Sequence, residues 1–191
     1  MSQAGGRAKK GRSTLTKRVA TLERTRPKQQ LKYIDTSINF DGTSTTTQAY
    51  RITAVAQGTG RSARIGNKIL VKKIEYTWHQ TAALGGATSA RTVEFQVFKA
   101  TDTDDLTARS DTLGEFPDPE KYTVMHSEGD SNVGGGSMMM HRGVLTTNFG
   151  IQFDQDASSG AIGKDLGAYF KTTGGNDIRV TGTVRTWFVD A

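Results

Sequence analysis

The chain has 191 residues, no cysteine, a net charge of +6, 22 glycines and only 3 prolines. The length suits one domain with a substantial hydrophobic core, and the lack of cysteine excludes disulfides and thiolate metal sites. No apolar run reaches the roughly 18 residues of a membrane span, and the N-terminal stretch is polar and basic, so we expect a soluble chain without a secretory signal.

Charge is distributed unevenly along the chain. Residues 1–32 contain ten Lys or Arg and one acid, a net charge of +9, whereas the remaining residues contain 15 basic and 18 acidic side chains, a net charge of −3. Blocks of like charge repel one another and cannot bury apolar surface. We therefore expect residues 1–30 to form a basic arm that is disordered in isolation, and residues 31–191 to form the folded domain.

The natural partner of such an arm is a polyanion, because Lys and Arg displace condensed counterions from a phosphate backbone. A solubilising tail or a nuclear localisation signal is the alternative, and the length of the run favours charge neutralisation. The arm contains no aromatic residue, so we expect contacts with phosphates rather than stacking on bases. The candidate nucleic-acid-binding residues are Arg7, Lys9, Lys10, Arg12, Lys17, Arg18, Arg24, Arg26 and Lys28.

Part of the arm has the pattern of a helix. Residues 13–26 place Leu15, Val19 and Leu22 at spacings of four and three, and Pro27 ends the pattern. A segment of about fourteen residues is marginal as an isolated helix, so coil remains an equal alternative in the free protein.

Beyond residue 31, short β-type stretches alternate with polar or glycine-rich turns. Val93, Phe95 and Val97, for example, alternate with other residues at the period of a strand. Because no amphipathic helices separate the stretches, the pattern predicts an all-β fold, either an antiparallel two-sheet sandwich or a barrel. The predicted strands cover 31–40, 48–56, 69–81, 91–100, 122–127, 137–146, 149–154, 168–172 and 177–189, with exposed loops at 102–120 and 128–137.

The glycine loop, residues 57–68 (QGTGRSARIGNK), combines glycines with basic residues as phosphate cradles do. A Walker A loop needs four residues between its glycines, followed by Lys and a hydroxyl residue, but five residues separate Gly60 from Gly66 and Ile69 follows Lys68. A dinucleotide fingerprint would open a helix, but here a predicted strand follows. We therefore interpret the loop as a tight basic connection between strands.

The longer string AVAQGTGRSARIGNKILVKKIEYTW resembles the segment before the second core strand in capsid proteins of small circular single-stranded DNA viruses that encode a replication initiator. The short coat protein of tobacco necrosis satellite virus is similar in architecture. The order of the later strands and the C-terminal strand agrees with this pattern. The matching residues are Gln57, Gly58, Gly60, Arg64, Ile65, Gly66, Lys68 and Ile69.

The resemblance implies an eight-stranded jelly roll, strands B to I, whose basic N-terminal arm points into a shell. It also implies a capsid protein that assembles as a homo-oligomer of about sixty copies, a T=1 icosahedral shell, and packages single-stranded nucleic acid, with DNA favoured over RNA. The expected location is the virion, and the host nucleus during assembly. The alternative is a cellular β-sandwich nucleic-acid-binding module with a basic tail.

Two sets of carboxylates are candidate calcium ligands at subunit contacts. Asp102, Asp104 and Asp105 form an acidic cluster, and hard cations take several carboxylate oxygens, although a solvated loop is the favoured interpretation. Asp190 is a second candidate through the resemblance to satellite virus coats.

The histidines and tryptophans are expected to pack in the fold rather than to take part in catalysis. His79, His126 and His141 have no metal-ligand spacing, and Trp78 and Trp187 are expected to be core residues or subunit anchors. No nucleophile elbow, zinc-binding helix or paired-carboxylate motif is present, so we expect neither an enzyme nor a cofactor.

Overall fold

The computed structural model describes residues 29–42, 45–82, 91–132, 140–154, 160–173 and 178–191. The chain divides into two units, Met1–Gln30 and Leu31–Ala191, and the fold below is that of the second unit. The predicted arm residues from Arg7 to Lys28, and the predicted helix at 13–26, lie outside the described residues.

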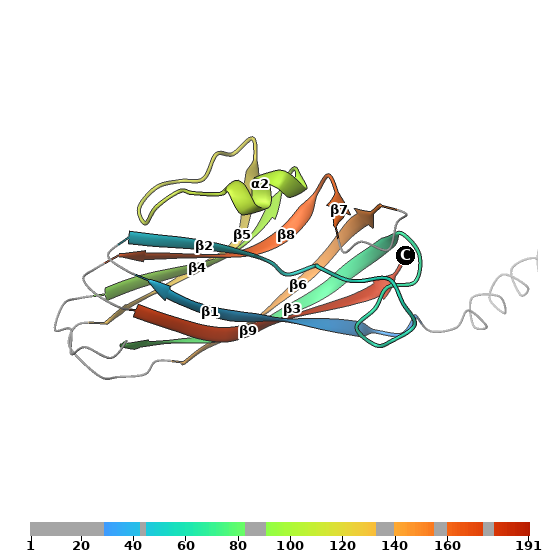
Figure 1. Ribbon diagram of the computed structural model, residues 1–191, viewed down its shortest axis with the longest axis horizontal. Helices are drawn as coiled ribbons and strands as arrows, with labels where there is room; N and C mark the ends of the chain where they lie inside the picture. Colours follow the sequence, from blue (N-terminus) through green and yellow to red (C-terminus); the bar gives the residue numbers. More distant parts are fainter. Residues whose placement is uncertain (1–28, 43–44, 83–90, 133–139, 155–159, 174–177) are drawn as a thin grey trace, which may run out of the picture. The chain divides into compact units, whose positions relative to one another are not determined.

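Two antiparallel sheets pack face to face and form two layers (Figure 1). Sheet I has the strand order β1-β9-β3-β6-β7, and sheet II has the order β2-β8-β4-β5. The strands are β1 (Lys32–Gly42), β2 (Thr45–Arg51), β3 (Lys68–Ala82), β4 (Arg91–Ala100), β5 (Tyr122–Asn132), β6 (Met140–Phe153), β7 (Ala161–Ile162), β8 (Asp165–Thr173) and β9 (Ile178–Asp190).

This strand order is that of a jelly roll. If the eight long strands are lettered B to I in chain order, sheet I reads B-I-D-G and sheet II reads C-H-E-F. Two interlocked Greek keys produce this arrangement. The predicted jelly-roll sandwich is therefore confirmed, and the barrel alternative is wrong.

Side chains that alternate inward from both sheets form the core. Trp78, Phe95 and Phe170 are fully buried at its centre, with ring centroids 4.9–6.1 Å apart. Trp78 comes from sheet I and the two phenylalanines come from sheet II, so the aromatic cluster joins the layers. Complete burial of aromatic rings supplies much of the hydrophobic stabilisation of such a sandwich.

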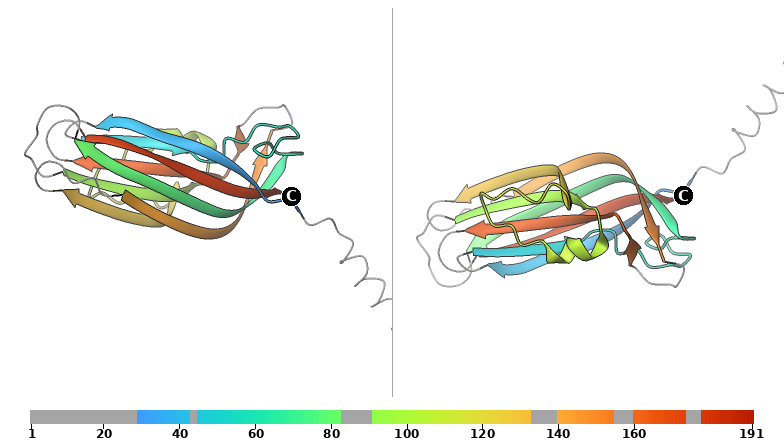
Figure 2. Two further views of the ribbon diagram at one scale, coloured as in Figure 1. Left: turned by 90° about the horizontal axis from the view of Figure 1, so that it is seen from below. Right: turned by 90° about the horizontal axis from the view of Figure 1, so that it is seen from above.

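A helix, α2 (Thr103–Ala108), covers the outer surface of sheet II (Figure 2). Its buried Leu106 packs with Phe98 and Tyr169 in a second, smaller apolar cluster. Asp102 is the N-cap and accepts a hydrogen bond from the backbone N–H of Asp104 at 3.1 Å. The prediction of a loop throughout 102–120 is therefore wrong for these six residues, because so short a helix with one buried side chain has no visible periodicity.

Several strand boundaries differ from the prediction: β8, for example, begins at Asp165 rather than at 168, and β7 was not predicted. The predicted strands 137–146 and 149–154 meet in the single strand β6, Met140–Phe153, with 137–139 outside the described residues. Strand β5 continues to Asn132 through part of a predicted loop. The break expected near 147–148 is a register shift instead: Val71 pairs with Phe149 but Lys73 pairs with Thr146, so two residues of β6 oppose one of β3. The second predicted strand, 48–56, begins earlier as β2 and ends at Arg51.

No helix within the described residues is long and apolar enough to cross a membrane.

Candidate functional site

The predicted nucleic-acid-binding residues of the basic arm, Arg7 to Lys28, lie outside the described residues, so their role stays a prediction. The other candidate sites lie in the described domain.

The glycine loop turns its central arginine inward. Arg64 is fully buried, its Nε donates to the Val55 carbonyl oxygen at 3.2 Å, and its guanidinium stands 4.4 Å above the ring of Phe153. The guanidinium also donates to the carbonyl oxygen of Gly66, whose φ of +82° is one that side chains rarely adopt. Because Arg64 is used inside the domain, the interpretation of this loop as a strand connection rather than a phosphate cradle is supported.

The candidate calcium ligands have other partners within the chain. Asp102 caps α2, and Asp105 lies 3.4 Å from Lys121 Nζ. Asp190 pairs with Lys32 Nζ at 2.7 Å and accepts a hydrogen bond from the Ile65 N–H at 2.8 Å. In the part of the chain that the structure describes, no group of three or more His, Cys, Asp or Glu is placed to hold a metal ion. A single subunit therefore offers no formed calcium site among these residues.

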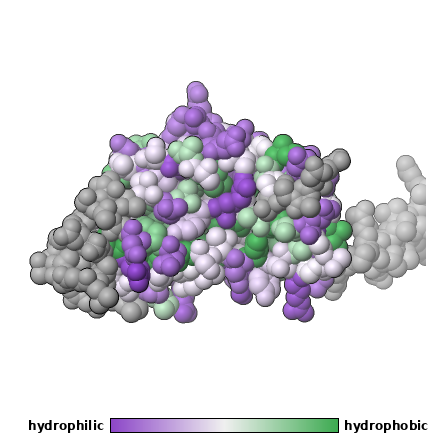
Figure 3. Space-filling view, in the orientation of Figure 1, coloured by the Kyte–Doolittle hydropathy of each residue, from purple (hydrophilic) through white to green (hydrophobic). Residues whose placement is uncertain are grey.

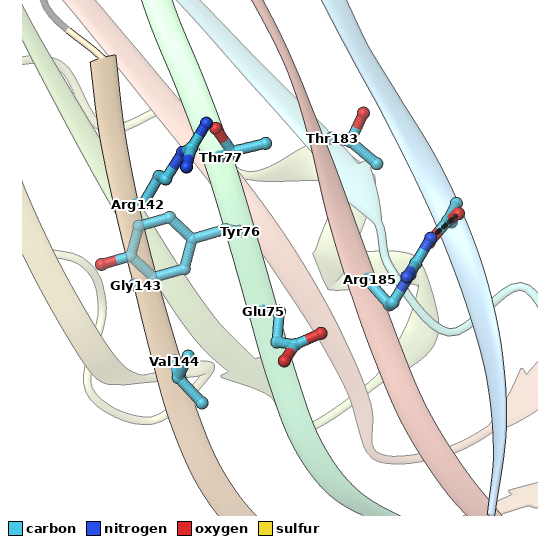
Figure 4. Close-up of a pocket in the computed structure, with 9 residues that line it drawn as sticks. Glu75, Tyr76, Thr77, Arg142, Gly143, Val144, Thr183 and Arg185 are labelled. Carbon is cyan, nitrogen blue, oxygen red and sulfur yellow. Dashed lines mark hydrogen bonds and ion pairs between the residues drawn. The ribbon is translucent and has the colours of Figure 1, made fainter.

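A shallow depression lies on the outer face of sheet I, with walls from β1, β3, β6 and β9 (Figure 4). Arg185 extends from β9 toward β1 and binds both carboxylate oxygens of Asp35, at 2.7 and 2.8 Å. This hydrogen-bonded ion pair lowers the pKa of the Asp35 carboxyl and raises the pKa of the Arg185 guanidinium. The lining residues are Asp35, Glu75, Tyr76, Thr77, Arg142, Gly143, Val144, Thr183 and Arg185.

Trp187 stands on this same outer face rather than in the core. Its ring lies 5.1 Å from that of Tyr33, Lys73 Nζ lies 4.7 Å from its centroid, and its Nε1 donates to Glu75 at 2.6 Å. The prediction of a core residue is thus wrong for Trp187, and its role as a subunit anchor stays a prediction.

A carboxylate at the centre of a polar network joins the two sheets. Glu128 of β5 accepts hydrogen bonds from Tyr76 Oη and Trp78 Nε1 of β3, both at 2.8 Å. His126 Nε2 also lies 2.8 Å from Tyr76 Oη. Burial and the hydrogen bond to Glu128 raise the pKa of Tyr76. These contacts link sheet I to the edge strand of sheet II.

The same network extends along β6. His141 stacks on Trp78 with ring centroids 4.0 Å apart and planes 7° apart, and its Nε2 lies 3.3 Å from Asp130. Asp130 in turn accepts a hydrogen bond from Gln80 Nε2 at 2.6 Å. Two of the three histidines therefore pack within the sandwich, as predicted, but they also share carboxylate partners that the sequence does not indicate.

Buried cations fix the segment between α2 and β5, residues 109–121, to sheet II. Asp111 pairs with Arg109 Nε at 2.6 Å and with Lys171 Nζ at 2.6 Å, and both cationic side chains are almost fully buried. Burial acts to raise the pKa of Asp111, but the hydrogen bonds from Arg109 and Lys171 outweigh it and the pKa is lowered. The guanidinium of Arg109 stands 4.2 Å from the Tyr169 ring, and burial raises the pKa of Tyr169 to about 12.

The visible surface is hydrophilic over α2 and the segment that follows it, with apolar residues in separate small patches (Figure 3). Among the described residues the large exposed apolar side chains are Leu31, Ile65, Phe116, Val124, Met125, Met140, Val144 and Ile162. Phe116 stands apart from the others because 94% of its surface is exposed.

Comparison with known proteins finds no match among protein-family models and none among curated proteins. Among solved structures, the chain is similar to a chain in the structure of infectious bursal disease virus, Gt strain, at 10% sequence identity and a TM-score of 0.33. It is also similar to the VP2 subviral particle of that virus, at 9% identity and a TM-score of 0.31. Each match covers 84% of this chain and 33% of the other, so the chain spans about a third of the length of those chains.

Proposed function

We propose that this chain is a viral capsid protein whose jelly roll builds a small icosahedral shell and whose basic arm packages single-stranded nucleic acid. In this proposal the partners are further copies of the same chain, about sixty in a T=1 shell, and a single-stranded genome, DNA in preference to RNA. The protein would reside in the virion, and in the host nucleus during assembly.

The observation that carries the proposal is the separation of charge from fold. Residues 1–32 hold a net charge of +9, whereas the remaining residues, which include nearly all of the jelly roll, hold −3. Several cations of the domain are paired with carboxylates: Arg179 binds Asp41 at 2.7 Å, and Arg185 binds Asp35 at 2.7 Å. A polyanion would therefore find its main cationic partner in the arm, while the domain remains available for contacts between subunits.

The size of the charge fits the proposed task. Sixty copies of an arm with +9 would bring on the order of 540 positive charges to the packaged strand, and each neutralised phosphate releases counterions. Binding of this kind is independent of base sequence and steeply dependent on salt. For a single strand, the logarithm of the affinity falls by about 0.7 per phosphate contact for each decade of salt.

Charge-neutral replacement in the arm tests this role. Five substitutions to glutamine should sharply reduce the nucleic acid recovered with the particles while leaving the thermal unfolding of the domain unchanged. The substituted residues are Lys9, Lys10, Arg12, Lys17 and Arg18.

The matched control carries five glutamine substitutions at Lys or Arg residues of the domain and should retain its nucleic acid. Equal loss in both variants, or a salt slope near zero in a titration with single-stranded oligonucleotides, would contradict the proposed role of the arm. The control residues are Arg61, Lys72, Lys99, Arg142 and Arg179.

A further inference from the structure

Phe116 projects from the domain with 94% of its surface exposed, more than any other large apolar side chain that the structure describes. Single exposed apolar residues are common on protein surfaces and need no explanation when they are mobile or partly covered. Phe116 differs because the chain on both sides of it is held in place, so the ring is presented to solvent by a fixed support.

Hydrogen bonds fix the chain before Phe116. The carbonyl oxygen of Glu115 accepts a hydrogen bond from the buried Lys171 Nζ at 2.9 Å, and the Glu115 carboxylate accepts one from the Thr112 N–H at 2.7 Å. Gly114, with φ of +87°, supplies the turn that brings these groups together.

The chain after Phe116 is fixed as well. Pro117 restricts the backbone of Phe116. The carboxylate of Asp118 accepts a hydrogen bond from the Glu120 N–H at 3.0 Å, and its carbonyl oxygen accepts one from the Tyr122 N–H at 2.8 Å. A side chain on a backbone fixed in this way loses less conformational entropy on binding than one on an unfixed loop, which suits an anchor residue in an interface.

Negative charge surrounds the ring in the sequence. Glu115, Asp118 and Glu120 are all exposed and lie within four residues of Phe116. Along the sequence, the nearest cation is Lys121. A surface that receives Phe116 should therefore be apolar at its centre and basic at its rim, because complementary charges guide association and like charges prevent it.

The chain itself carries exposed aliphatic and basic side chains of the kind that such a surface needs. Ile162 of β7 is 53% exposed and pairs across the sheet with Gln152, which pairs in turn with Lys68, so the three side chains share one face. Lys164 is exposed just beyond Ile162, and Ile65, also exposed, precedes the start of β3. We call Ile65, Ile162, Lys68 and Lys164 the aliphatic patch.

We propose that Phe116 inserts against the aliphatic patch of a second copy of this chain, with Glu115, Asp118 and Glu120 facing Lys68 and Lys164. This inference rests on the proposed function, because it names the contact by which the jelly rolls associate. β7 lies near the end of the sandwich that holds the C-terminus, whereas the segment with Phe116 lies outside sheet II (Figure 1). The two surfaces are distinct, so the contact is heterologous and propagates from copy to copy, as a closed ring or shell requires.

The first test compares Phe116→Ser with Val144→Ser by sedimentation velocity over a range of protein concentrations. Val144 is the matched control because it is also an exposed apolar residue, 62% exposed, but lies on β6 eight residues from Gln152, the residue of β6 that pairs with the aliphatic patch. Phe116→Ser should raise the concentration needed for half-assembly at least about tenfold, and Val144→Ser should leave it unchanged. Both variants should retain the far-ultraviolet circular dichroism of the wild type.

The second test exchanges charges across the contact. Glu120→Lys and Lys164→Glu should each weaken assembly, because each places like charges together, and the double variant should restore it. The side chain of Glu120 is suitable because its neighbours Glu115 and Asp118, not Glu120 itself, cap the turns of the segment.

The outcomes separate this contact from the proposed function. The contact is overturned if Phe116→Ser assembles at the same concentration as the wild type, or if the double charge variant assembles no better than the single ones. Either result leaves the capsid proposal standing. Association that depends on Phe116 but stops at small oligomers supports the contact and contradicts the capsid proposal. A wild type that stays monomeric at every concentration overturns both.

Discussion

Substitution of Glu128 should weaken the contact between the two sheets most directly. This residue extends from the edge strand of sheet II and accepts hydrogen bonds from Tyr76 Oη and Trp78 Nε1 of sheet I. Trp78 is fully buried and Tyr76 is 6% exposed, so neither donor gains a full replacement from water when the carboxylate is removed. Glu128→Ala should therefore destabilise the domain without altering its fold.

The magnitude follows from the two donors. Each buried donor left without an acceptor costs about 1–3 kcal/mol, so the loss of both acceptors sets an upper range of about 2–6 kcal/mol for the fall in the free energy of unfolding. His126 Nε2, 2.8 Å from Tyr76 Oη, offers Tyr76 another partner and lowers the expected value. The Glu128 side chain is 23% exposed, which admits some water and places the value toward the lower end of that range. Glu128→Gln should lose about half as much, because its amide oxygen satisfies one donor while its NH₂ group faces the other.

Urea unfolding followed by tryptophan fluorescence provides the assay, with the midpoint and slope fitted separately. Glu120→Ala is the control, since Glu120 is an exposed acid of the same type, and its effect should stay within about 0.5 kcal/mol. If Glu128→Ala unfolds at the wild-type midpoint with an unchanged slope, the network does not join the sheets energetically, and the reasoning from its geometry is wrong.

Three further substitutions test the packing of the domain. Gly182→Ala would place a Cβ 2.3 Å from the Thr77 carbonyl oxygen, so β3 and β9 must move apart. The free energy of unfolding should fall by about 1–3 kcal/mol or more, and the melting temperature should fall with it. Lys171→Met removes a buried partner of Asp111 and should cost about 3 kcal/mol in urea unfolding. Because the pKa of Asp111 is lowered by Arg109 and Lys171, its ionised form stabilises the domain above about pH 4, and this contribution is lost as the pH falls through the lowered pKa. The difference in melting temperature between wild type and Asp111→Asn should therefore shrink on acidification, and a constant difference would contradict this assignment.

Local patterns predicted the fold wherever one face of a strand is apolar. The alternation of Val93, Phe95 and Val97 predicts β4 with the bounds that the structure has, Arg91–Ala100, because these side chains are fully buried against the opposite sheet. The interruption in β6 was also a genuine signal, but its physical cause is a register shift opposite Lys72 rather than a turn. A single sequence cannot distinguish the two, because both place polar residues between two β-type stretches.

The polar network could not be predicted from local patterns. Glu128 lies about fifty residues from Trp78 along the chain and reaches it only because β5 and β3 belong to facing sheets. Its one visible signal is that His126, Glu128 and Asp130 alternate at the period of a strand. That alternation is polar, as in an exposed strand, and the inward direction of these side chains is set by the pairing of β5 with β4.

The most direct test of the central claim is electron microscopy of the full-length chain after nuclease treatment, with light scattering and the ultraviolet absorbance ratio measured on the same fraction. The capsid proposal predicts uniform shells of about sixty copies that protect nucleic acid from the nuclease. A monomer that persists across salt, pH and calcium conditions, with no protected nucleic acid, would contradict it and favour a nucleic-acid-binding module with a basic tail.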